Sequence, residues 1–172
     1  YIMNNKILAI GRYNGFVIRS ISELADYSNL DAIVLFKKEN LVFPSNVKNI
    51  KAFKLVNFLS IIKFYYYIFK NRNKYDGFIF YYMQEYFYAL LILNIIKKAT
   101  YYFPFGSDLH KSGVNKFLMK KSLKNFNNIF VELETQKQYI IDNYKVPKKK
   151  IETSFVIFNV DSCFYRFEEE QK

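Results

Sequence analysis

The chain has 172 residues, of which 51% are hydrophobic, 20% aromatic and 24% charged, and its formal net charge is +11. This length allows about one domain with a single packed core, and the composition excludes collagen, a coiled coil and a disordered chain. With one cysteine, Cys163, and one histidine, His110, the chain has neither a disulfide framework nor a Cys/His metal site. We therefore expect no metal.

The location and partners of the chain are suggested by its N-terminus and its charge. No charged segment followed by an apolar stretch and a cleavage site opens the sequence, so we expect a cytoplasmic protein without an export signal. The positive charge favours an anionic partner, because clustered ammonium groups are attracted to nucleic acid and to anionic lipid. A bias toward Lys, Asn, Ile, Tyr and Phe, typical of AT-rich coding DNA, explains the same charge without any partner.

Apolar runs of strand length alternate with segments of helical period along the chain. The runs that predict strands are residues 6–11, 31–36, 47–53, 77–82, 100–105, 128–133 and 151–160. The segments that predict helices are residues 16–27, 56–72, 85–98, 115–125 and 136–144. This alternation is typical of βαβ units, and it predicts an α/β fold with a mostly parallel sheet and helices on both faces.

Two of these segments allow a second interpretation that involves a membrane. Residues 78–96 have the length of a membrane span, but Gln84 and Glu85 lie at the centre, where a charge costs about 3 kcal/mol on insertion scales. We therefore interpret this segment as a strand, a polar loop and a buried helix.

The helix predicted over residues 56–72 carries an apolar stripe at helical spacing. The stripe consists of Leu59, Ile62, Tyr66 and Phe69. Such a stripe is usually the buried face of a core helix. With Lys63 and Lys70 beside it, the aromatic helix over residues 58–69 also fits peripheral docking on an anionic membrane.

Candidate site residues are found in the turns that follow the predicted strands. In an open parallel sheet, ligands bind outside the carboxyl ends of the strands, where helix N-termini leave unpaired N–H donors. The residues at these turns are Arg12, Asn14, Gly15, Gln84, Glu85, Gly106, Ser107, Asp108, Glu132 and Thr135. Neither G-x-G-x-x-G nor G-x-x-x-x-G-K-[ST] occurs, so no dinucleotide fingerprint or Walker loop is present.

The turn over residues 106–108 is the most specific of these. A glycine followed by two oxygen-bearing side chains can offer acceptors to several hydroxyls of one sugar. Alternatively, Ser107 or Asp108 caps the next helix, as Thr135 is expected to cap the helix over residues 136–144. Asp108 and His110 are the candidates for a catalytic acid or base, and a solvated surface histidine is the alternative for His110.

Taken in order, these turns resemble the N-terminal domain of GT-B glycosyltransferases of the group 1 type. Residues 106–108 resemble the family's His-Gly-Ser-Asp segment, and residues 130–135 followed by 138–140 resemble its strand-to-helix segment. Residues 156–161 with Phe164 resemble the Val-Ile-Pro-Asn-Gly-Val-Asp…Phe segment that closes the N-terminal domain. The resemblance covers nearly the whole chain.

The sequence departs from the family pattern at three places. Phe105 stands where the family often has His, Phe158 stands where it has Pro, and a Gly is missing between Asn159 and Val160. The first departure leaves the position of the usual acceptor-side histidine without a histidine, and the second makes the hinge atypical, while the implied fold is unchanged.

The resemblance implies a Rossmann-like three-layer domain over residues 1–161, with residues 162–172 starting the interdomain segment. This domain would shape the acceptor site, while a C-terminal domain absent from this chain would hold most of the nucleotide-sugar. The whole enzyme would move a sugar to a glycan or lipid-linked acceptor, at the inner face of the membrane when the acceptor is lipid-linked. We expect no cofactor in this domain and no activity from this chain alone.

Two other functions are weighed against this one. A non-enzymatic basic module could bind nucleic acid through Lys120, Lys121, Lys124 and residues 148–150, but no helix-turn-helix, RNP or zinc signature supports it. A receiver-like domain needs paired carboxylates after its first strand, and Gly11 and Arg12 stand there instead.

Overall fold

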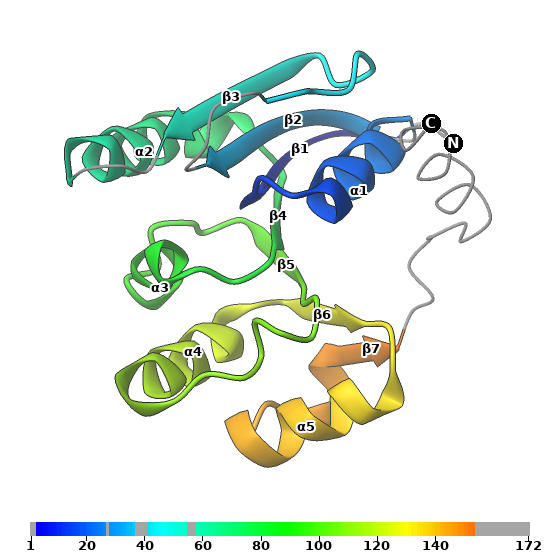
Figure 1. Cartoon of the computed structure of the whole chain (residues 1–172), viewed down its shortest axis with the longest axis vertical. Helices are drawn as coiled ribbons and strands as arrows, with labels where there is room; N and C mark the ends of the chain where they lie inside the picture. The colour runs from blue at the N-terminus through cyan, green and yellow to red at the C-terminus, as the bar shows by residue number, and fades with distance from the viewer. Residues whose placement is uncertain (1–2, 27, 37–40, 55–57, 154–172) are drawn as a thin grey trace, which may run out of the picture.

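The computed structural model describes residues 3–26, 28–36, 41–54 and 58–153. Within these ranges seven parallel strands form one sheet, in the order β3-β2-β1-β4-β5-β6-β7 (Figure 1). The strands are β1 (Met3–Arg12), β2 (Ser28–Phe36), β3 (Asn49–Lys54), β4 (Gly77–Tyr81), β5 (Ala99–Phe103), β6 (Asn128–Val131) and β7 (Ile151–Thr153). The predicted α/β fold with a parallel sheet is confirmed.

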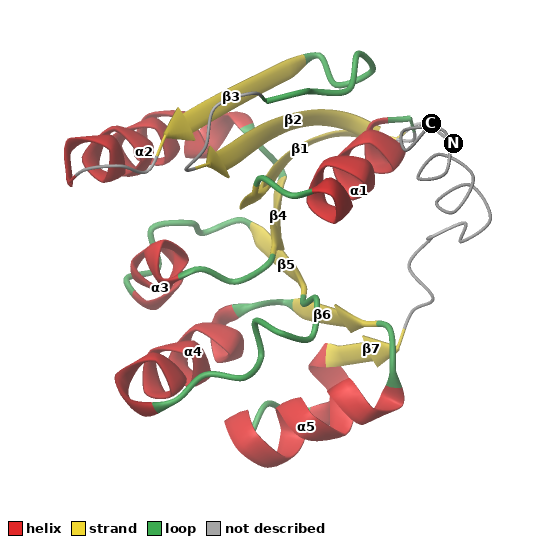
Figure 2. Cartoon of the chain, viewed as in Figure 1, coloured by secondary structure: helices red, strands yellow, loops and turns green. Residues whose placement is uncertain are grey.

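The helices lie on both faces of the sheet, as predicted. They are α1 (Gly15–Ala25), α2 (Phe58–Asn71), α3 (Glu85–Ile92), α4 (Gly113–Asn125) and α5 (Glu134–Tyr144), with 3₁₀ turns η1 (Arg72–Lys74) and η2 (Lys148–Lys150). Helices α2, α3 and α4 form a layer on one face, and α1 lies on the other (Figure 2). In a right-handed crossover, the direction of the step along the sheet decides on which face the connecting helix lies. The step from β1 to β2 runs in the opposite direction to the steps from β4 to β7, so α1 lies on the opposite face.

Burial along the strands follows this arrangement of helices. Strand β4 is buried at every position, because both of its faces are covered. In β5 and β6, by contrast, Tyr102 and Ile129 are buried against the helix layer, whereas Tyr101, Phe103 and Phe130 on the other face are half-buried. Helix α1 packs mainly on β1 and β2, so this aromatic part of the sheet is less covered than the face that carries the helix layer.

Helix α3 ends six residues before the predicted end at residue 98, since its last residue is Ile92. Asn94 adopts the left-handed conformation, with φ at 51°. The N–H of Asn94 donates to Leu91 O at 3.2 Å and that of Ile95 to Leu90 O at 3.0 Å. These two bonds form a Schellman motif, which ends a helix although the apolar residues continue beyond it. Among the described residues, no helix has the length and hydrophobicity needed to cross a membrane.

Helix α2 buries a different face from the one that its apolar stripe suggests. The face against the sheet is formed by Phe64 and Ile68, which are completely buried. The predicted stripe, Leu59, Ile62, Tyr66 and Phe69, faces solvent. The helix is apolar nearly all round, with the sequence FLSIIKFYYYIFKN, so periodicity alone cannot select the buried face.

The predicted caps of helices α4 and α5 are wrong. Helix α4 begins at Gly113 after Ser112, and the side chain of Asp108 is buried in the core. Helix α5 begins at Glu134, so Thr135 lies inside its first turn. Strand β7 confirms the start of the strand predicted over residues 151–160, and residues 154–161 lie outside the described part of the chain.

Candidate functional site

The carboxyl ends of all seven described strands lie at one edge of the sheet, because the strands are parallel. The strand order reverses between β1 and β4: β1 leads to β2 on one side, whereas β4 leads to β5 on the other. Such a reversal leaves a crevice where α/β proteins bind ligands. Residues 13–14 and 82–84 follow the two strands at this point, and the turns after β5 and β6 lie along the same edge. The four turns selected from the sequence therefore share one edge.

The connection from β1 to α1 contains a cap, and exposed residues lie on each side of it. Asn14 caps α1, since its Oδ1 accepts the N–H of Val17 at 2.8 Å. Arg12 and Gly15 are exposed, and a Cβ added at Gly15 would meet no atom within 4 Å. At Gly11 a Cβ would lie 2.6 Å from Val17 Cγ1, so this glycine allows α1 to approach the sheet closely.

Asp108 connects the turns after β4 and β5. It is completely buried, and its Oδ2 accepts the N–H of Met83 at 2.7 Å and the hydroxyl of Tyr102. Its Oδ1 accepts the N–H of Phe105 at 3.0 Å. Burial raises the pKa of Asp108, while these three donors act in the opposite direction by stabilising the carboxylate. Both oxygens are thus occupied by donors of the protein, which defines Asp108 as a structural brace of the site.

The residue before Met83 has an unusual backbone. Tyr82 adopts the left-handed conformation, with φ at 60°, which is rare for residues with a side chain of this size. Its N–H donates to Phe103 O at 3.4 Å. Strained positions of this kind gather at functional sites, and this one lies at the strand-order reversal. The sequence gives no signal for it.

A second connection joins the turns after β5 and β6. Gly106 has φ at 73°, and a Cβ there would lie 3.5 Å from Nε2 of Gln136. The Oε1 of Gln136 accepts the N–H of Glu132 at 3.1 Å. Gln136 therefore lies between the two turns, although the sequence did not indicate it as a site residue. The neighbouring Ser107 is exposed.

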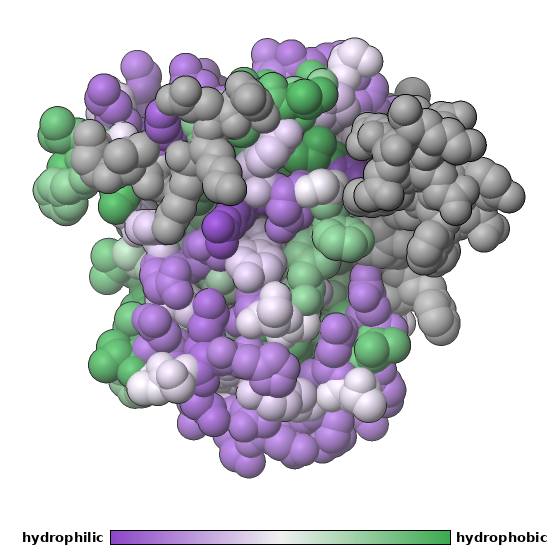
Figure 3. Space-filling view, in the orientation of Figure 1, coloured by the Kyte–Doolittle hydropathy of each residue, from purple (hydrophilic) through white to green (hydrophobic). Residues whose placement is uncertain are grey.

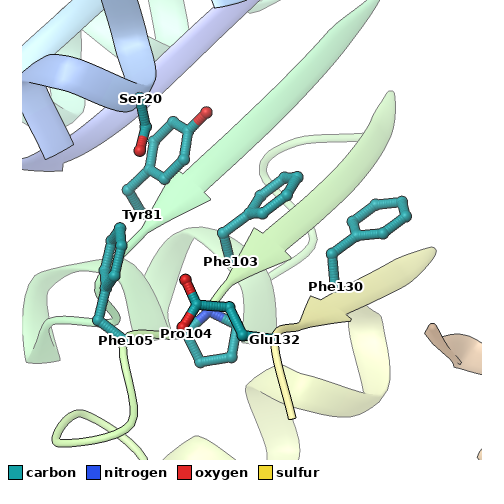
Figure 4. A pocket seen from close by; sticks show the side chains of 7 residues that line it. All are labelled: Ser20, Tyr81, Phe103, Pro104, Phe105, Phe130 and Glu132. Atoms are coloured by element: carbon teal, nitrogen blue, oxygen red, sulfur yellow. The ribbon is translucent and has the colours of Figure 1, made fainter. Parts of the chain in front are cut away.

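A small hollow of about 10 Å³, room for about one water molecule, lies at this edge on the face that carries α1. Its lining residues are Ser20, Tyr81, Phe103, Pro104, Phe105, Phe130 and Glu132 (Figure 4). The rings of Tyr81 and Phe103 stack with centroids 5.4 Å apart, and those of Phe103 and Phe130 with centroids 5.0 Å apart. Phe105 stacks on Tyr81 at 6.3 Å. We call these seven residues the aromatic hollow.

Glu132 is the one predicted site residue that lines the aromatic hollow. Its carboxylate has no hydrogen-bond or ion-pair partner among the described residues, and burial raises its pKa. An ionised carboxylate is purely an acceptor of hydrogen bonds. The hollow therefore combines partly exposed aromatic rings with one free acceptor, and a ligand ring would lie across its mouth rather than inside it.

The other predicted residues lie at the same edge but outside the hollow. Glu85, in the first turn of α3, forms an ion pair with Lys111 at 3.5 Å. Gln84 precedes α3 as its N-cap residue, without a side-chain cap bond. His110 is exposed, and its ring centroid lies 4.7 Å from that of Tyr139. The exposed Thr135 is in the first turn of α5.

No protein-family model matches the chain, and none of the curated proteins matches it significantly. Solved structures do match its fold. Alr3699/HepE from Anabaena, in complex with UDP and glucose, superposes with a TM-score of 0.62 at 12% identity, over 92% of this chain and 46% of that protein. A UDP-N-acetylglucosamine 2-epimerase from Rickettsia bellii gives 0.64 at 14% identity, over 97% and 48%. A glycosyltransferase from Rickettsia africae ESF-5 gives 0.60 at 14% identity, over 96% and 50%.

These matches define the fold of the chain as a Rossmann-like half of the GT-B arrangement. The chain spans about half the length of each of these three structures. At such low identity the likeness extends to the fold alone, which an epimerase and a glycosyltransferase share. The chemistry of the site, rather than the fold, determines the activity.

Proposed function

We propose that this chain is the acceptor-binding N-terminal domain of a glycosyltransferase that moves a sugar from a nucleotide-sugar to a glycan or lipid-linked acceptor. The observation that carries this proposal is the aromatic hollow with its unpaired Glu132 carboxylate, at the ligand-binding edge of a GT-B half. The second half of the enzyme would hold the nucleotide-sugar, so this domain needs no cofactor of its own.

The hollow has the chemistry that a sugar acceptor requires. A sugar ring presents C–H groups on its faces and hydroxyls around its rim. The rings of Phe103, Phe105 and Phe130 offer apolar area to a face, since aromatic rings bury much apolar surface at low entropic cost. Glu132 can accept a hydrogen bond from a rim hydroxyl and so orient it.

Two alternatives receive less support from the structure. An epimerisation changes one substrate and needs no acceptor site. Because the aromatic hollow has the chemistry of an acceptor site, it favours sugar transfer over epimerisation. A nucleic-acid module would use the basic residues of α4 and η2. Of these, Lys150 is committed to the fold, because its Nζ donates to Lys124 O and Phe126 O at 2.8 Å each.

Binding of glycans to the purified chain tests the acceptor site. Glu132→Ala and Phe105→Ala are each expected to weaken glycan binding about tenfold or more, because a hydrogen bond to a charged group contributes about 1.5–3 kcal/mol and a large aromatic contact a similar amount. Binding would be measured on a glycan array and by calorimetry on the hits. Asp142→Ala, an exposed carboxylate of α5, is the matched control and should bind like the wild type. Equal binding by all four proteins would refute the site.

A further inference from the structure

The outer face of α2 exposes a continuous apolar stripe. The exposed fractions are 74% for Phe58, 64% for Leu59, 46% for Ile62, 63% for Tyr66 and 57% for Phe69. Spacings of three and four residues place these side chains on one face of the helix, along about 16 Å of its axis. We call these five residues the α2 stripe. Exposed apolar surface of this kind marks an interaction site in a folded protein.

Cations border the α2 stripe. Lys63 and Lys70 are exposed on the same helix, and Lys70 Nζ lies 6.0 Å from the centroid of the Tyr66 ring. The guanidinium of Arg72 lies 4.1 Å from the centroid of the Phe69 ring. These contacts keep two positive charges beside the aromatic rings.

The sequence around α2 carries positive charge alone. Between residues 40 and 75 there is no Asp or Glu, whereas the Lys and Arg residues are Lys48, Lys51, Lys54, Lys63, Lys70, Arg72 and Lys74. A second hollow beside the end of α2 is lined by Lys48, Lys51 and Lys74. It also contains the carboxylate of Asp31, which forms an ion pair with Lys6 at 3.0 Å. The basic surface thus extends beyond the helix.

We propose that the α2 stripe docks on an anionic lipid bilayer. Aromatic and aliphatic side chains enter the interface of a bilayer, while Lys and Arg beside them reach the head groups with long flexible stems. Each cation near an anionic surface is attracted to it, so charge and apolar area act together.

A second copy of this chain is a poorer occupant of the same face. A two-fold contact brings identical patches together, and here it would set cations against cations with no carboxylate between residues 40 and 75 to pair them. The bilayer supplies the opposite charge.

The position of the α2 stripe in the fold is compatible with the acceptor site. Hydrophobic surface is visible along the side of the molecule where α2, α3 and α4 lie (Figure 3). The aromatic hollow is on the other face of the sheet, since Tyr81 and Phe103 belong to the cluster around α1. Docking through α2 would leave the hollow open.

Sedimentation with vesicles tests the docking surface independently of any sugar transfer. The purified chain is mixed at 0.1 M salt with vesicles of phosphatidylglycerol and phosphatidylcholine, or of phosphatidylcholine alone. We expect binding to the anionic vesicles and at least tenfold weaker partitioning for Lys63→Glu/Lys70→Glu. The matched control, Lys148→Glu/Lys149→Glu, makes the same charge change on exposed residues of η2, next to β7 at the far edge of the sheet, and should stay within twofold of the wild type.

A second variant separates apolar insertion from charge. Leu59→Ser/Ile62→Ser removes two exposed side chains, so the fold is expected to persist while partitioning also falls at least tenfold. At 1 M salt, where the Debye length is about 3 Å, the charge effect should disappear. Absent binding to anionic vesicles, or equal loss in the η2 control, would overturn the proposal. So would a dimer, detected by ultracentrifugation, that the Leu59→Ser/Ile62→Ser variant dissociates.

Discussion

Replacing Asp108 by alanine is expected to lower the free energy of unfolding by about 3–5 kcal/mol, because it leaves buried donors without acceptors. The donors are the N–H groups of Met83 and Phe105 and the hydroxyl of Tyr102. A total stability of about 5–15 kcal/mol makes this a large fraction. Chemical denaturation of the purified chain measures the effect.

A conservative variant and a neighbouring control sharpen this experiment. Asp108→Asn keeps the volume and one carbonyl acceptor, so we expect a smaller loss than for alanine. Ser107→Ala changes an exposed residue of the same turn and should shift stability by less than about 0.5 kcal/mol. If Asp108→Ala unfolded at the same denaturant concentration as Ser107→Ala, the brace formed by Asp108 would contribute nothing.

Replacing Gly11 by alanine is expected to cost about 1–3 kcal/mol, because the new Cβ overpacks the contact between α1 and the sheet. It would lie 2.6 Å from Val17 Cγ1 and 3.3 Å from the carbonyl oxygen of Tyr81. Both the β-branched side chain and the strand are rigid, so neither can move away cheaply. Denaturation of the variant gives the change in free energy.

A double-mutant cycle tests whether this contact is the cause. Val17→Ala removes Cγ1, so the cost of Gly11→Ala should fall in the Val17→Ala background. Gly15→Ala is the matched control, because its Cβ would meet nothing within 4 Å, and it should be neutral or slightly stabilising. If the losses in unfolding free energy from Gly11→Ala and Val17→Ala were purely additive, the new Cβ and Val17 Cγ1 would not compete for the same space.

The sequence predicts the strands well because their burial pattern is local. Continuous apolar runs mark β2 and β4, which have cover on both faces, whereas the alternating burial of Tyr101, Tyr102 and Phe103 appears only in the structure because all three residues are aromatic. Asn94, which adopts the left-handed conformation, is the one residue in the sequence that signals the end of α3, because the apolar residues continue past this position. The buried face of α2 depends on Phe64 and Ile68 meeting the sheet, which periodicity does not determine.

The site is less predictable because its parts come from distant segments. A parallel sheet alone brings the four turns to one edge, and this follows from the sequence. The role of Asp108 depends on the N–H of Met83, 25 residues earlier in the chain, so its position after a strand suggests an exposed cap instead. The aromatic residues of β5, with Phe105 after it and Phe130 on the next strand, are a signal for the aromatic hollow, although the sequence does not say which of them share a face.

Sugar transfer is the most direct test of the central claim that this chain is half of an active site. The 172-residue chain is incubated with a panel of nucleotide-sugars and the glycans that bind it, and product is detected by mass spectrometry. The proposal predicts no turnover by this chain alone. It predicts transfer when the chain is part of one polypeptide with a second, donor-binding Rossmann-like half, and loss of that transfer in Glu132→Ala. Turnover by the 172-residue chain alone would contradict the account.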